Sequence, residues 1–391
     1  MMQQQRIVII GGGIIGLSTA YTLLRSGIEQ VTVLEQAVID HEQASSHGIS
    51  RLLRFEYGSD TLYSQMVQLS LQRWQRLEQI VKRRLYTPTG LLVLGSELDE
   101  YTPASYAVLR KLGLTPEHLT HENCAHRFPQ FNTQDFDLLT FNINAGILHA
   151  STCLQTLRSC ITALGGTILE HHRVTHIDND RSQAPIRLHI SGGETIIADR
   201  VAVATGPWVH RLLGEMDLPV RLTRQYLLYF SDLPIERYNL YNFPAFIADD
   251  LYGFPLHKTG NQGPLYLKAA SHSFGAPAIP DEEPLVDENV IQQVSRRLYH
   301  LLPELKQAKL AKVESYMYDV SSDEDFILDY LPQDQRIVFA TGLSGHGFKF
   351  GLLLGEIMSS LLCETSSVIP LDRFRLMRFS PTIQTPIHSV A

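Results

Sequence analysis

Residues 6–35 read RIVIIGGGIIGLSTAYTLLRSGIEQVTVLE, and this stretch decides the fold. The apolar run at residues 6–10 is typical of a strand buried on both faces, and residues 31–34 repeat that pattern. Between them, apolar residues recur at helical spacing until Gly27, which is placed to end a helix. The stretch therefore predicts a strand–helix–strand unit with parallel strands and a right-handed crossover.

The turn between the first strand and the helix carries a G-x-G-x-x-G motif at Gly11, Gly13 and Gly16. Its glycines allow a tight turn, a close approach of a pyrophosphate to the backbone, and close packing of the helix on the strand. The helix N-terminus offers unpaired N–H groups and a partial positive charge to phosphates. Glu35 ends the second strand, 19 residues after Gly16, where a carboxylate can bind ribose hydroxyls. We predict a dinucleotide cofactor; the alternative is a tight turn without a ligand.

Two later segments repeat the pattern of an apolar strand that ends in glycine, at residues 200–206 and 336–342. If all three strands share one sheet, that domain is discontinuous and a second domain is inserted in two pieces. A domain for a nicotinamide cofactor needs no sequence so far from the first turn, so this arrangement favours FAD over NAD. The predicted limits are 1–84, 146–218 and 311–380 for the FAD-binding domain, 85–145 and 219–310 for the substrate domain, and 381–391 for a loose C-terminal tail.

The composition is that of a folded, mildly acidic protein. Of 391 residues, 44% are hydrophobic and 19% are charged, and the net charge is −8. These values exclude long disordered regions and disfavour nucleic-acid binding. Four cysteines without a C-x-x-C pair form no metal motif and suit a reducing compartment. Glycines interrupt the apolar stretch at residues 7–24, so we expect no targeting segment and no membrane span. From the cysteine pattern we expect a cytoplasmic protein without a metal site.

The segment Gly345–Phe350 follows the last apolar strand and reads GHGFKF. It resembles monomeric sarcosine oxidase and its relatives, which include N-methyltryptophan oxidase and pipecolate oxidase, in the D-amino-acid-oxidase-like flavoprotein superfamily. Further matches run in order between about residues 6 and 380, and they are Ser46-His47-Gly48 with Arg51 and Arg54, Tyr252-Gly-Phe-Pro255, Leu267-Lys268 with His272-Ser-Phe-Gly275, Met317-Tyr318, and Asp323-Glu324 with Phe326-Ile327. The resemblance implies an α/β fold in which an FAD-binding Rossmann-like domain of the glutathione-reductase type carries an inserted antiparallel-sheet α+β substrate domain.

The same resemblance implies a pocket for an amine that bears a carboxylate. Arg54 and Lys349 are expected to hold that carboxylate, the guanidinium as a bidentate partner and the ammonium as a point charge. Tyr252 and His272 are expected near the amine and the reacting face of the flavin, and Tyr318 is expected to form a pocket wall.

Two further residues bear on the flavin chemistry. Lys268 resembles the lysine with which the family activates oxygen beside flavin N5, and a fixed cation there stabilises developing negative charge. The relatives attach FAD covalently through a cysteine just before the Met-Tyr pair, whereas this chain has Tyr316 at that position. We therefore predict non-covalent FAD. The segment from Leu256 to Lys268 is also longer than is usual in the family, which changes the expected pocket shape.

The residues expected to contact FAD come from the glycine turn, from loops that follow the other strands and from the segment after residue 45. They are Gly11, Gly13, Ile14, Ile15, Gly16, Glu35, Ser46, His47, Arg51, Val174, Gly206, Gly342, Gly345, His346, Gly347, Phe348 and Lys349. Each of these residue types alone is more common in a core or on a surface than in a site. The prediction therefore depends on the whole set.

Together these features predict FAD-dependent oxidation of a carboxylate-bearing secondary or cyclic amine, of the sarcosine, N-methyl amino acid or imino acid type. The product is an imine, and oxygen is reduced to hydrogen peroxide. The alternatives are a dehydrogenase of the same fold that passes electrons to a quinone or a protein, a D-amino-acid oxidase, and a binding or assembly protein without turnover. We expect a monomer whose partners are the small amine and oxygen, without nucleic acid.

Overall fold

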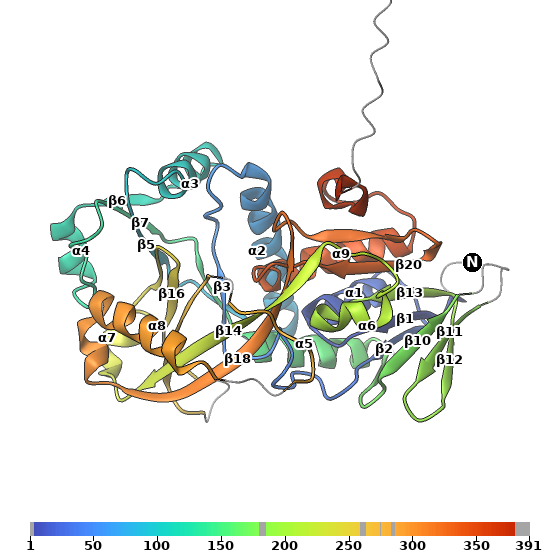
Figure 1. Ribbon diagram of the computed structural model, residues 1–391. Coiled ribbons are helices and arrows are strands. Elements are labelled where there is room, and N and C mark those ends of the chain that lie inside the picture. Colours follow the sequence, from blue (N-terminus) through green and yellow to red (C-terminus); the bar gives the residue numbers. More distant parts are fainter. Residues whose placement is uncertain (1–3, 180–184, 259–262, 274, 283–285, 380–391) are drawn as a thin grey trace, which may run out of the picture.

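The computed structural model describes residues 4–179, 185–258, 263–273, 275–282 and 286–379. Figure 1 shows two bodies side by side, one built around a six-stranded sheet and the other around an eight-stranded sheet. The predicted tail at 381–391 and residues 259–262 of the long segment after Leu256 lie outside the described residues. None of the described helices is long and apolar enough to cross a membrane.

The six-stranded sheet contains all three of the predicted strands that end in glycine. Neighbouring strands are parallel except for the last pair at one edge, β19 and β20, which is antiparallel. In spatial order the strands are β19 (Ile327–Leu331), β20 (Asp334–Thr341), β13 (Arg200–Val203), β1 (Ile7–Ile10), β2 (Val31–Leu34) and β9 (Thr167–Leu169). The prediction that distant parts of the chain share one sheet is therefore confirmed, while the exact domain limits stay a prediction.

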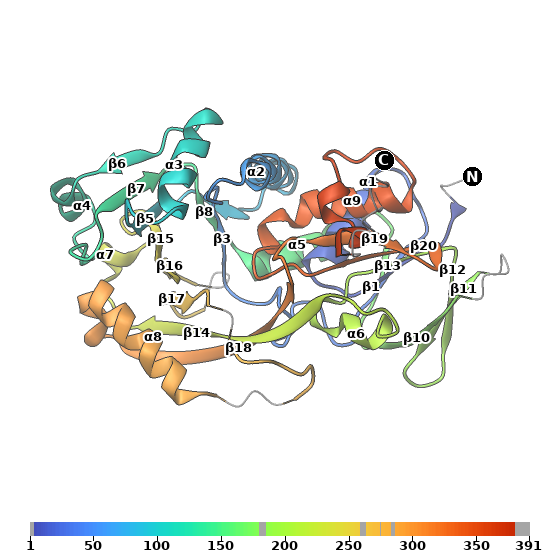
Figure 2. The same ribbon diagram turned by 45° about the horizontal axis from the view of Figure 1, so that its top comes forward.

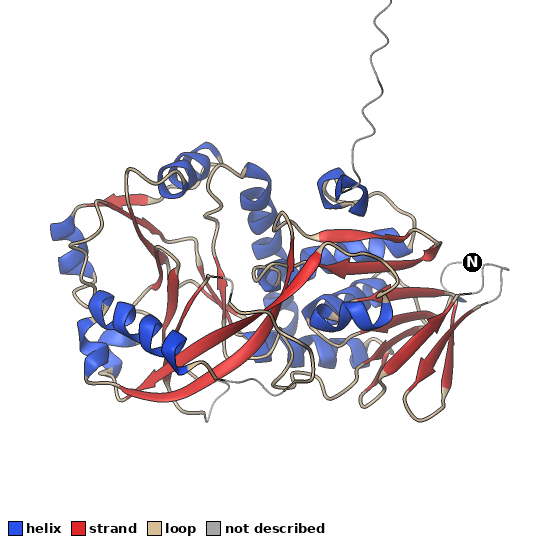
Figure 3. Cartoon of the chain, in the orientation of Figure 1, coloured by secondary structure: helices blue, strands red, loops and turns tan. Residues whose placement is uncertain are grey.

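Helices and a smaller sheet surround this parallel core (Figure 3). In the smaller sheet, a hairpin turns at Gly192 and Gly193, and its two strands pair antiparallel. The helices are α1 (Ile14–Arg25), α5 (Ala150–Ala163), α6 (Val209–Leu212) and α9 (Gly351–Leu362), and the smaller sheet consists of β10 (Val174–Asp178), β11 (Ile186–Ile190) and β12 (Thr195–Ala198).

Helices α1 and α9 approach each other closely at two glycines of α9. A Cβ built on Gly355 would lie 2.5 Å from the carbonyl carbon of Ser18 and 2.7 Å from its oxygen. A Cβ on Gly351 would lie 2.4 Å from the Cγ1 atom of Ile14, at the start of α1. The position of α1, and with it the glycine turn, therefore depends on the absence of side chains on α9.

We expect Gly355→Ala to destabilise the protein. Alanine improves helix propensity by about 1 kcal/mol, but extra volume in a packed core costs about 1–3 kcal/mol. The close neighbour here is backbone, which cannot rotate away as a side chain can, so packing should outweigh propensity. Urea unfolding should show a lower midpoint with an unchanged slope. Ser360→Ala on the same helix, at a partly exposed position, is the control and should leave the midpoint nearly unchanged; an equal or higher midpoint for Gly355→Ala would contradict the expectation.

The second body is built on the eight-stranded sheet, which is antiparallel apart from one pair. The prediction of an antiparallel sheet is therefore confirmed except for strands β15 and β5, which are parallel. The two strands belong to separate stretches of the chain, so no hairpin connection fixes their relative direction. In spatial order the strands are β18 (Lys309–Ser321), β14 (Val220–Ser231), β17 (Tyr266–Ser271), β16 (Leu251–His257), β15 (Ala245–Ala248), β5 (Leu91–Gly95), β7 (Leu138–Asn142) and β6 (Glu117–Leu119).

Helices cover the outer parts of this second body, and α8 lies along β14 and β18 in Figure 2. Apolar residues of α8, including Val294 and Leu298, share a buried core with Leu228 and Phe230 of β14. The helices are α3 (Tyr101–Lys111), α4 (His121–Arg127), α7 (Ile235–Tyr238) and α8 (Glu288–Leu301), and the short 3₁₀ turns of the chain are η2 (Gly206–Trp208), η3 (Pro303–Lys306), η4 (Phe348–Phe350), η5 (Asp372–Phe374) and η6 (Leu376–Phe379).

Helix α2 (Thr61–Val81) and a three-stranded sheet of β3 (Arg51–Leu53), β8 (Gly146–Leu148) and β4 (Tyr86–Thr87) complete the chain. Asp60 caps α2, because its carboxylate accepts a hydrogen bond from the N–H of Tyr63 at 3.1 Å. Met66 and Trp74 of α2 are buried, and Leu62, Leu69 and Leu71 are partly buried and pack against the same hydrophobic core. Trp74 also connects α2 to η4, since its Nε1 donates a hydrogen bond to the carbonyl oxygen of Lys349 at 2.8 Å.

Candidate active site

The glycine turn after β1 has the geometry of a phosphate-binding turn. Gly11 has a φ of +109°, and a Cβ there would lie 2.3 Å from the carbonyl oxygen of Ala204 at the end of β13. A Cβ on Gly16 would lie 1.9 Å from the carbonyl oxygen of Gly11, so only glycine fits under the turn. Gly13 precedes α1 and supplies no side-chain cap. The N–H of Ile14 donates to the Oγ atom of Ser46 at 3.0 Å, so the other N–H groups of the first turn are the ones available to an anion.

Glu35 ends β2 beside this turn, as predicted from its spacing. Its carboxylate accepts hydrogen bonds from the N–H of Gly12 at 2.7 Å and from the N–H of Ala37 at 2.9 Å. Each carboxylate oxygen keeps a further lone pair. Glu35 therefore fixes the turn and can still accept hydrogen bonds from a diol.

A small cavity opens at the carboxyl ends of the parallel strands, the edge at which sheets of this type bind nucleotides. Its volume is about 110 Å³, and Trp208, Arg173 and Arg211 form part of its wall. The predicted residues that line it are Gly11, Gly13, Ile14, Ile15, Glu35, Ser46, Val174 and Gly206.

A larger cavity of about 770 Å³ lies beyond the glycine turn, with walls from both bodies of the protein. Ile14, Ser46 and Leu343 belong to the walls of both cavities, so the two cavities adjoin at these residues. The predicted residues that line the larger cavity are Ile14, Ser46, Arg51, Arg54, Tyr252, Lys268, His272, Tyr318, Gly345, His346, Gly347, Phe348 and Lys349.

Three predicted cofactor residues lie outside the walls of both cavities, as far as the described residues define them: Gly16, His47 and Gly342. Gly16 packs beneath the turn. His47 bonds through Nδ1 to the carbonyl oxygen of Asp40 at 2.8 Å and to its carboxylate at 2.9 Å, and this carboxylate raises the pKa of the imidazole. Gly342 has a φ of +63° and lies against Ser321. Direct contact of Gly16, His47 and Gly342 with the cofactor stays a prediction.

Two cations converge on Tyr57 at one end of the larger cavity. The Cζ atom of Arg54 lies 4.4 Å from the ring centroid of Tyr57, and the Nζ of Lys349 donates to its hydroxyl at 2.7 Å. Arg54 also donates to the hydroxyl of Tyr101 at 2.5 Å. Among the described residues, neither cation forms an ion pair with a carboxylate. This end of the cavity is therefore suited to an anion.

Burial and the neighbouring guanidinium both act on Lys349. Desolvation, and then the positive charge of Arg54, hold the pKa of its ammonium well below the usual value. A bound anion would reverse part of this effect, because an opposite charge favours the protonated amine. Lys349 is thus a group whose charge responds to a ligand.

Tyr57, which accepts the hydrogen bond of Lys349, is itself hydrogen-bonded to a histidine. The hydroxyl of Tyr57 lies 3.2 Å from Nδ1 of His346, and Nε2 of His346 lies 3.3 Å from the carbonyl oxygen of Glu324. Since a carbonyl only accepts, Nε2 carries the proton and Nδ1 accepts from Tyr57. Burial holds the pKa of His346 well below its usual value, in agreement with a neutral ring. Tyr57 contacts Arg54, Lys349 and His346, and no sequence motif predicted it.

Three tyrosine hydroxyls form a chain in the wall formed by β16 and β18. The hydroxyl of Tyr316 lies 3.1 Å from that of Tyr252 and 3.0 Å from that of Tyr318. Burial raises the pKa values of Tyr252 and Tyr316, so both stay protonated. His272 lies edge-on to Tyr252, with ring centroids 6.3 Å apart. Its pKa is lowered to about 4 by burial and then by the charges of Arg54 and Lys349, so this imidazole is neutral at pH 7.

Lys268 is almost fully buried, with 1% of its surface exposed. Its Nζ donates to the carbonyl oxygen of Ser50 at 2.6 Å and lies 4.6 Å from the ring centroid of Phe254. Arg51 donates to the same carbonyl oxygen at 2.8 Å. Burial, and then the charge of Arg51, hold the pKa of Lys268 well below its usual value. The side chains of Lys268 and Arg51 therefore both bond to the carbonyl oxygen of Ser50 at this wall of the cavity.

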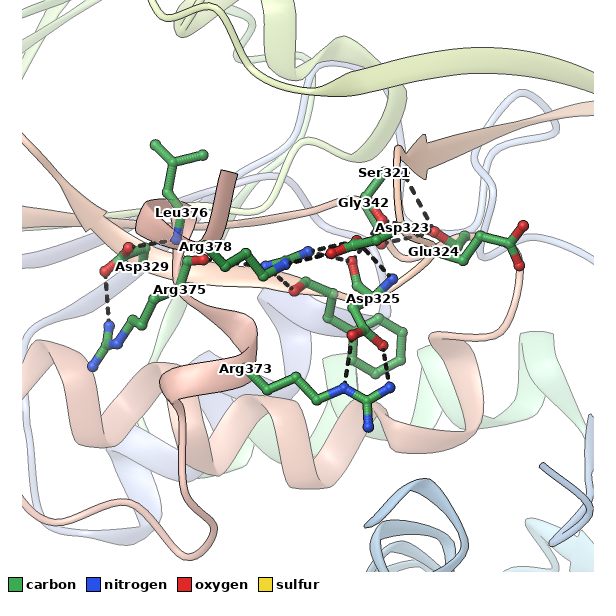
Figure 4. A network of polar contacts seen from close by, with 12 residues as sticks. Ser321, Asp323, Glu324, Asp325, Asp329, Gly342, Arg373, Arg375, Leu376 and Arg378 are labelled. Atoms are coloured by element: carbon green, nitrogen blue, oxygen red, sulfur yellow. Dashed lines mark hydrogen bonds and ion pairs between the residues drawn. The ribbon is translucent and has the colours of Figure 1, made fainter. Parts of the chain in front are cut away.

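Ion pairs tie the last described residues to Asp323 and Asp325 (Figure 4), which belong to the lining of the larger cavity. Arg373 pairs with Asp325 at 2.7 Å and with Asp60 at 2.6 Å. Arg378 pairs with Asp323 at 2.7 Å. These contacts fix the loop that also presents the carbonyl oxygen of Glu324 to His346. Among the described residues, no three His, Cys, Asp or Glu side chains converge as the ligands of a metal ion would.

Comparison with known proteins identifies the family. Residues 6–361 match the model of the family DAO, described as FAD dependent oxidoreductase. The chain belongs to this family. It is 30% identical over 385 residues to peroxisomal sarcosine oxidase of Mus musculus, covering 95% of this chain and 96% of the relative. It is also 30% identical over 386 residues to N-methyl-L-tryptophan oxidase of Yersinia pestis (strain Pestoides F), with coverage of 95% and 99%.

Solved structures agree on the fold of this FAD-dependent oxidoreductase. L-proline dehydrogenase from P. horikoshii superposes with a TM-score of 0.83 at 20% identity, covering 97% of this chain and 98% of the other. Glycine oxidase from Geobacillus kaustophilus gives 0.80 at 20% identity, with coverage of 96% and 98%. The protein is thus an amine oxidoreductase with FAD as its cofactor. The glycine turn, where a Cβ at Gly11 or Gly16 would collide with backbone, fits the diphosphate of FAD.

Proposed function

We propose that the protein oxidises a secondary or cyclic amine that carries a carboxylate, producing an imine while oxygen is reduced to hydrogen peroxide. The observation that carries this proposal is the pair Arg54 and Lys349, which share the ring of Tyr57 and have no carboxylate partner among the described residues. The named substrates of the relatives, sarcosine and N-methyl-L-tryptophan, also combine a secondary amine with a carboxylate.

FAD, when bound, accepts the two electrons that leave the amine as its C–N single bond becomes a C=N double bond. The chain's own residues orient the substrate and set charges. Arg54 and Lys349 hold the carboxylate, so that the amine lies toward Tyr252 and the neutral ring of His272. Lys268 and Arg51 provide positive potential where oxygen gains negative charge. We further propose that the enzyme works as a monomer in the cytoplasm.

A second candidate function is a dehydrogenase that passes electrons to a quinone or another protein. Tyr316 favours it, because covalent attachment through a cysteine generally raises the potential of a flavin and so helps an oxidase. The buried Lys268 opposes it. A D-amino-acid oxidase differs only in the amine that fills the same pocket.

The central experiment is anaerobic reduction of the holoenzyme with matched amines. Sarcosine, N-methyl amino acids and proline-like imino acids should bleach the flavin absorbance, while the corresponding carboxamides should bleach it much more slowly. Turnover with oxygen, compared with turnover with an artificial acceptor, then separates the oxidase from the dehydrogenase. Absence of bleaching by every amine in the panel would refute the proposal.

We expect the flavin to be released by acid. Tyr316 offers a phenol hydroxyl that is bonded to two other tyrosines, and a phenol lacks the nucleophilicity of a thiolate. Precipitation with trichloroacetic acid should leave the yellow colour in the supernatant for the natural protein and for Tyr316→Phe alike. Flavin that stays with the pellet of the natural protein would refute non-covalent binding, and flavin that stays with the pellet of Tyr316→Phe would place the bond at another residue.

A further inference from the structure

His257 is a buried polar group that the proposed chemistry does not yet use. It ends β16, and only 2% of its surface is exposed. In the register of β16 and β17, Phe254 pairs with Lys268 and His257 pairs with Tyr266, because a bulge lies between Phe254 and His257. Directly paired residues point to the same face of a sheet. His257 therefore lies diagonally beside Lys268 on the face that carries the lysine.

The hydrogen bonds of His257 define its tautomer. Nδ1 lies 2.6 Å from the carbonyl oxygen of Pro255, which can only accept, so Nδ1 carries the proton. Burial lowers the pKa of the ring to about 3, and it is neutral at pH 7. Nε2 is thus an acceptor, and it has no partner among the described residues. A buried acceptor without a donor is unfavourable, which argues that a small donor such as water fills the space.

A second histidine continues from His257 toward the surface. His149 lies edge-on to His257 with ring centroids 6.3 Å apart, and its side chain is only partly buried. Its Nε2 lies 2.9 Å from the hydroxyl of Thr87. His149 precedes α5, and like His257 it lies outside the walls of both cavities as far as these are described. The two rings thus extend from Lys268 to solvent on a side separate from the cavity.

The charges around this path come from several elements. Lys268 faces His257 from β17 and has Arg51 and Glu314 as its own charged neighbours. His149 has Arg84 and Glu78 nearby, and burial followed by Arg84 lowers its pKa. Both histidines are therefore mostly neutral at pH 7, as groups that relay protons through water need to be.

We propose that a water bound at Nε2 of His257, together with His149, connects Lys268 to solvent. This path supplies the protons that the reduction of oxygen beside Lys268 consumes. The inference rests on the proposed function. Reduction of one oxygen molecule to hydrogen peroxide takes two electrons, which come from the amine through FAD, and two protons. The transfer runs twice for each oxygen molecule: each proton that leaves Nζ of Lys268 for oxygen is replaced by one from the bound water, and the water each time regains its proton from solvent past His149.

The kinetic test uses His257→Phe and His149→Phe, which keep ring volume but remove the nitrogens. The reduced holoenzyme of each should react with oxygen at least 10-fold more slowly at pH 8, with a larger solvent deuterium effect than the natural enzyme. Reduction by amine should change less than 2-fold. His118→Phe, at an exposed position of β6, is the matched control and should leave both rates unchanged. Unchanged oxygen rates in both path variants would overturn the proposal.

A second measurement does not need turnover. A crystal structure of the holoenzyme should show an ordered water within hydrogen-bond distance of Nε2 of His257, and in His257→Phe that water should be absent. A dry Nε2, or one bonded to a protein atom, would overturn the proposal even if the enzyme is active. If no amine reduces the flavin, the proposed function fails while this structural readout still decides whether the water site exists.

Discussion

Replacing Lys268 with methionine is expected to slow the reaction of the reduced enzyme with oxygen by roughly 10²–10³-fold, the usual effect of removing one preorganised charge from a site. Lys268 is buried, is held by the carbonyl oxygen of Ser50 at 2.6 Å and has no carboxylate partner among the described residues. Its charge is therefore little screened and is available to a developing anion. Methionine keeps the length of the side chain and removes only the ammonium.

The measurement is a stopped-flow comparison of the two half-reactions. Reduction by amine should change less than 5-fold in Lys268→Met, since the lysine bonds to the carbonyl oxygen of Ser50, whereas Arg54 and Lys349 both contact Tyr57. Stability should be equal or higher, because a desolvated ammonium is replaced by an apolar group. Lys306→Met, at an exposed position, controls for net charge. An oxygen rate within 3-fold of the natural enzyme would remove Lys268 from the proposed chemistry.

The parts of this fold that the sequence predicted are those dictated by local rules. The turn at residues 11–16 needs glycine because a Cβ at Gly11 or Gly16 would collide with backbone. The strands of the parallel sheet are short apolar runs bounded by glycine, so their periodicity and their ends are visible without tertiary information. Their common sheet follows from the rule that a cofactor site needs neighbouring strand ends.

The parts that were missed depend on contacts between distant segments. Tyr101 reaches Arg54 from the start of α3, and Tyr57 joins Arg54 to Lys349, yet neither tyrosine belongs to a motif. The parallel pairing of β5 with β15 is set by how two separate insertions meet. Arg373 and Arg378 find their carboxylates across about fifty residues of chain. No spacing rule encodes such contacts, because these groups meet only when segments that are distant in the sequence have folded together.

The histidines illustrate the limit for single residues. His47 and His346 were both expected at the cofactor, and the structure separates them by their partners: Asp40 holds His47, while His346 accepts from Tyr57 at the cavity wall. His257 and His149 had no sequence signal, since an apolar strand and a helix start surround them. The chemistry of an imidazole depends on which group bonds to each nitrogen, and that is a property of the assembled structure.

Loss of either cation at the anion end of the cavity should give a large and selective defect. We expect Arg54→Met and Lys349→Met each to lower kcat/KM for an amine carboxylate by at least about 30-fold, because truncating one partner of a buried charge contact costs about 2–5 kcal/mol and every 1.4 kcal/mol is tenfold. Lys349 should respond more strongly, since it is almost fully buried while Arg54 is only partly so.

A carboxylate contact is identified by comparing how much each variant loses with the acid substrate and with its carboxamide. A substrate whose carboxylate is replaced by a carboxamide lacks the negative charge, so its poor kcat/KM should fall less than 3-fold in either variant. Arg110→Met, at an exposed position of α3, controls for net charge and should behave as the natural enzyme. An equal loss for the acid and the amide would mean that Arg54 and Lys349 shape the cavity rather than bind the anion. A loss confined to the acid would locate the charged end of the substrate between the two cations, and the reacting C–N bond would then lie toward the tyrosine chain.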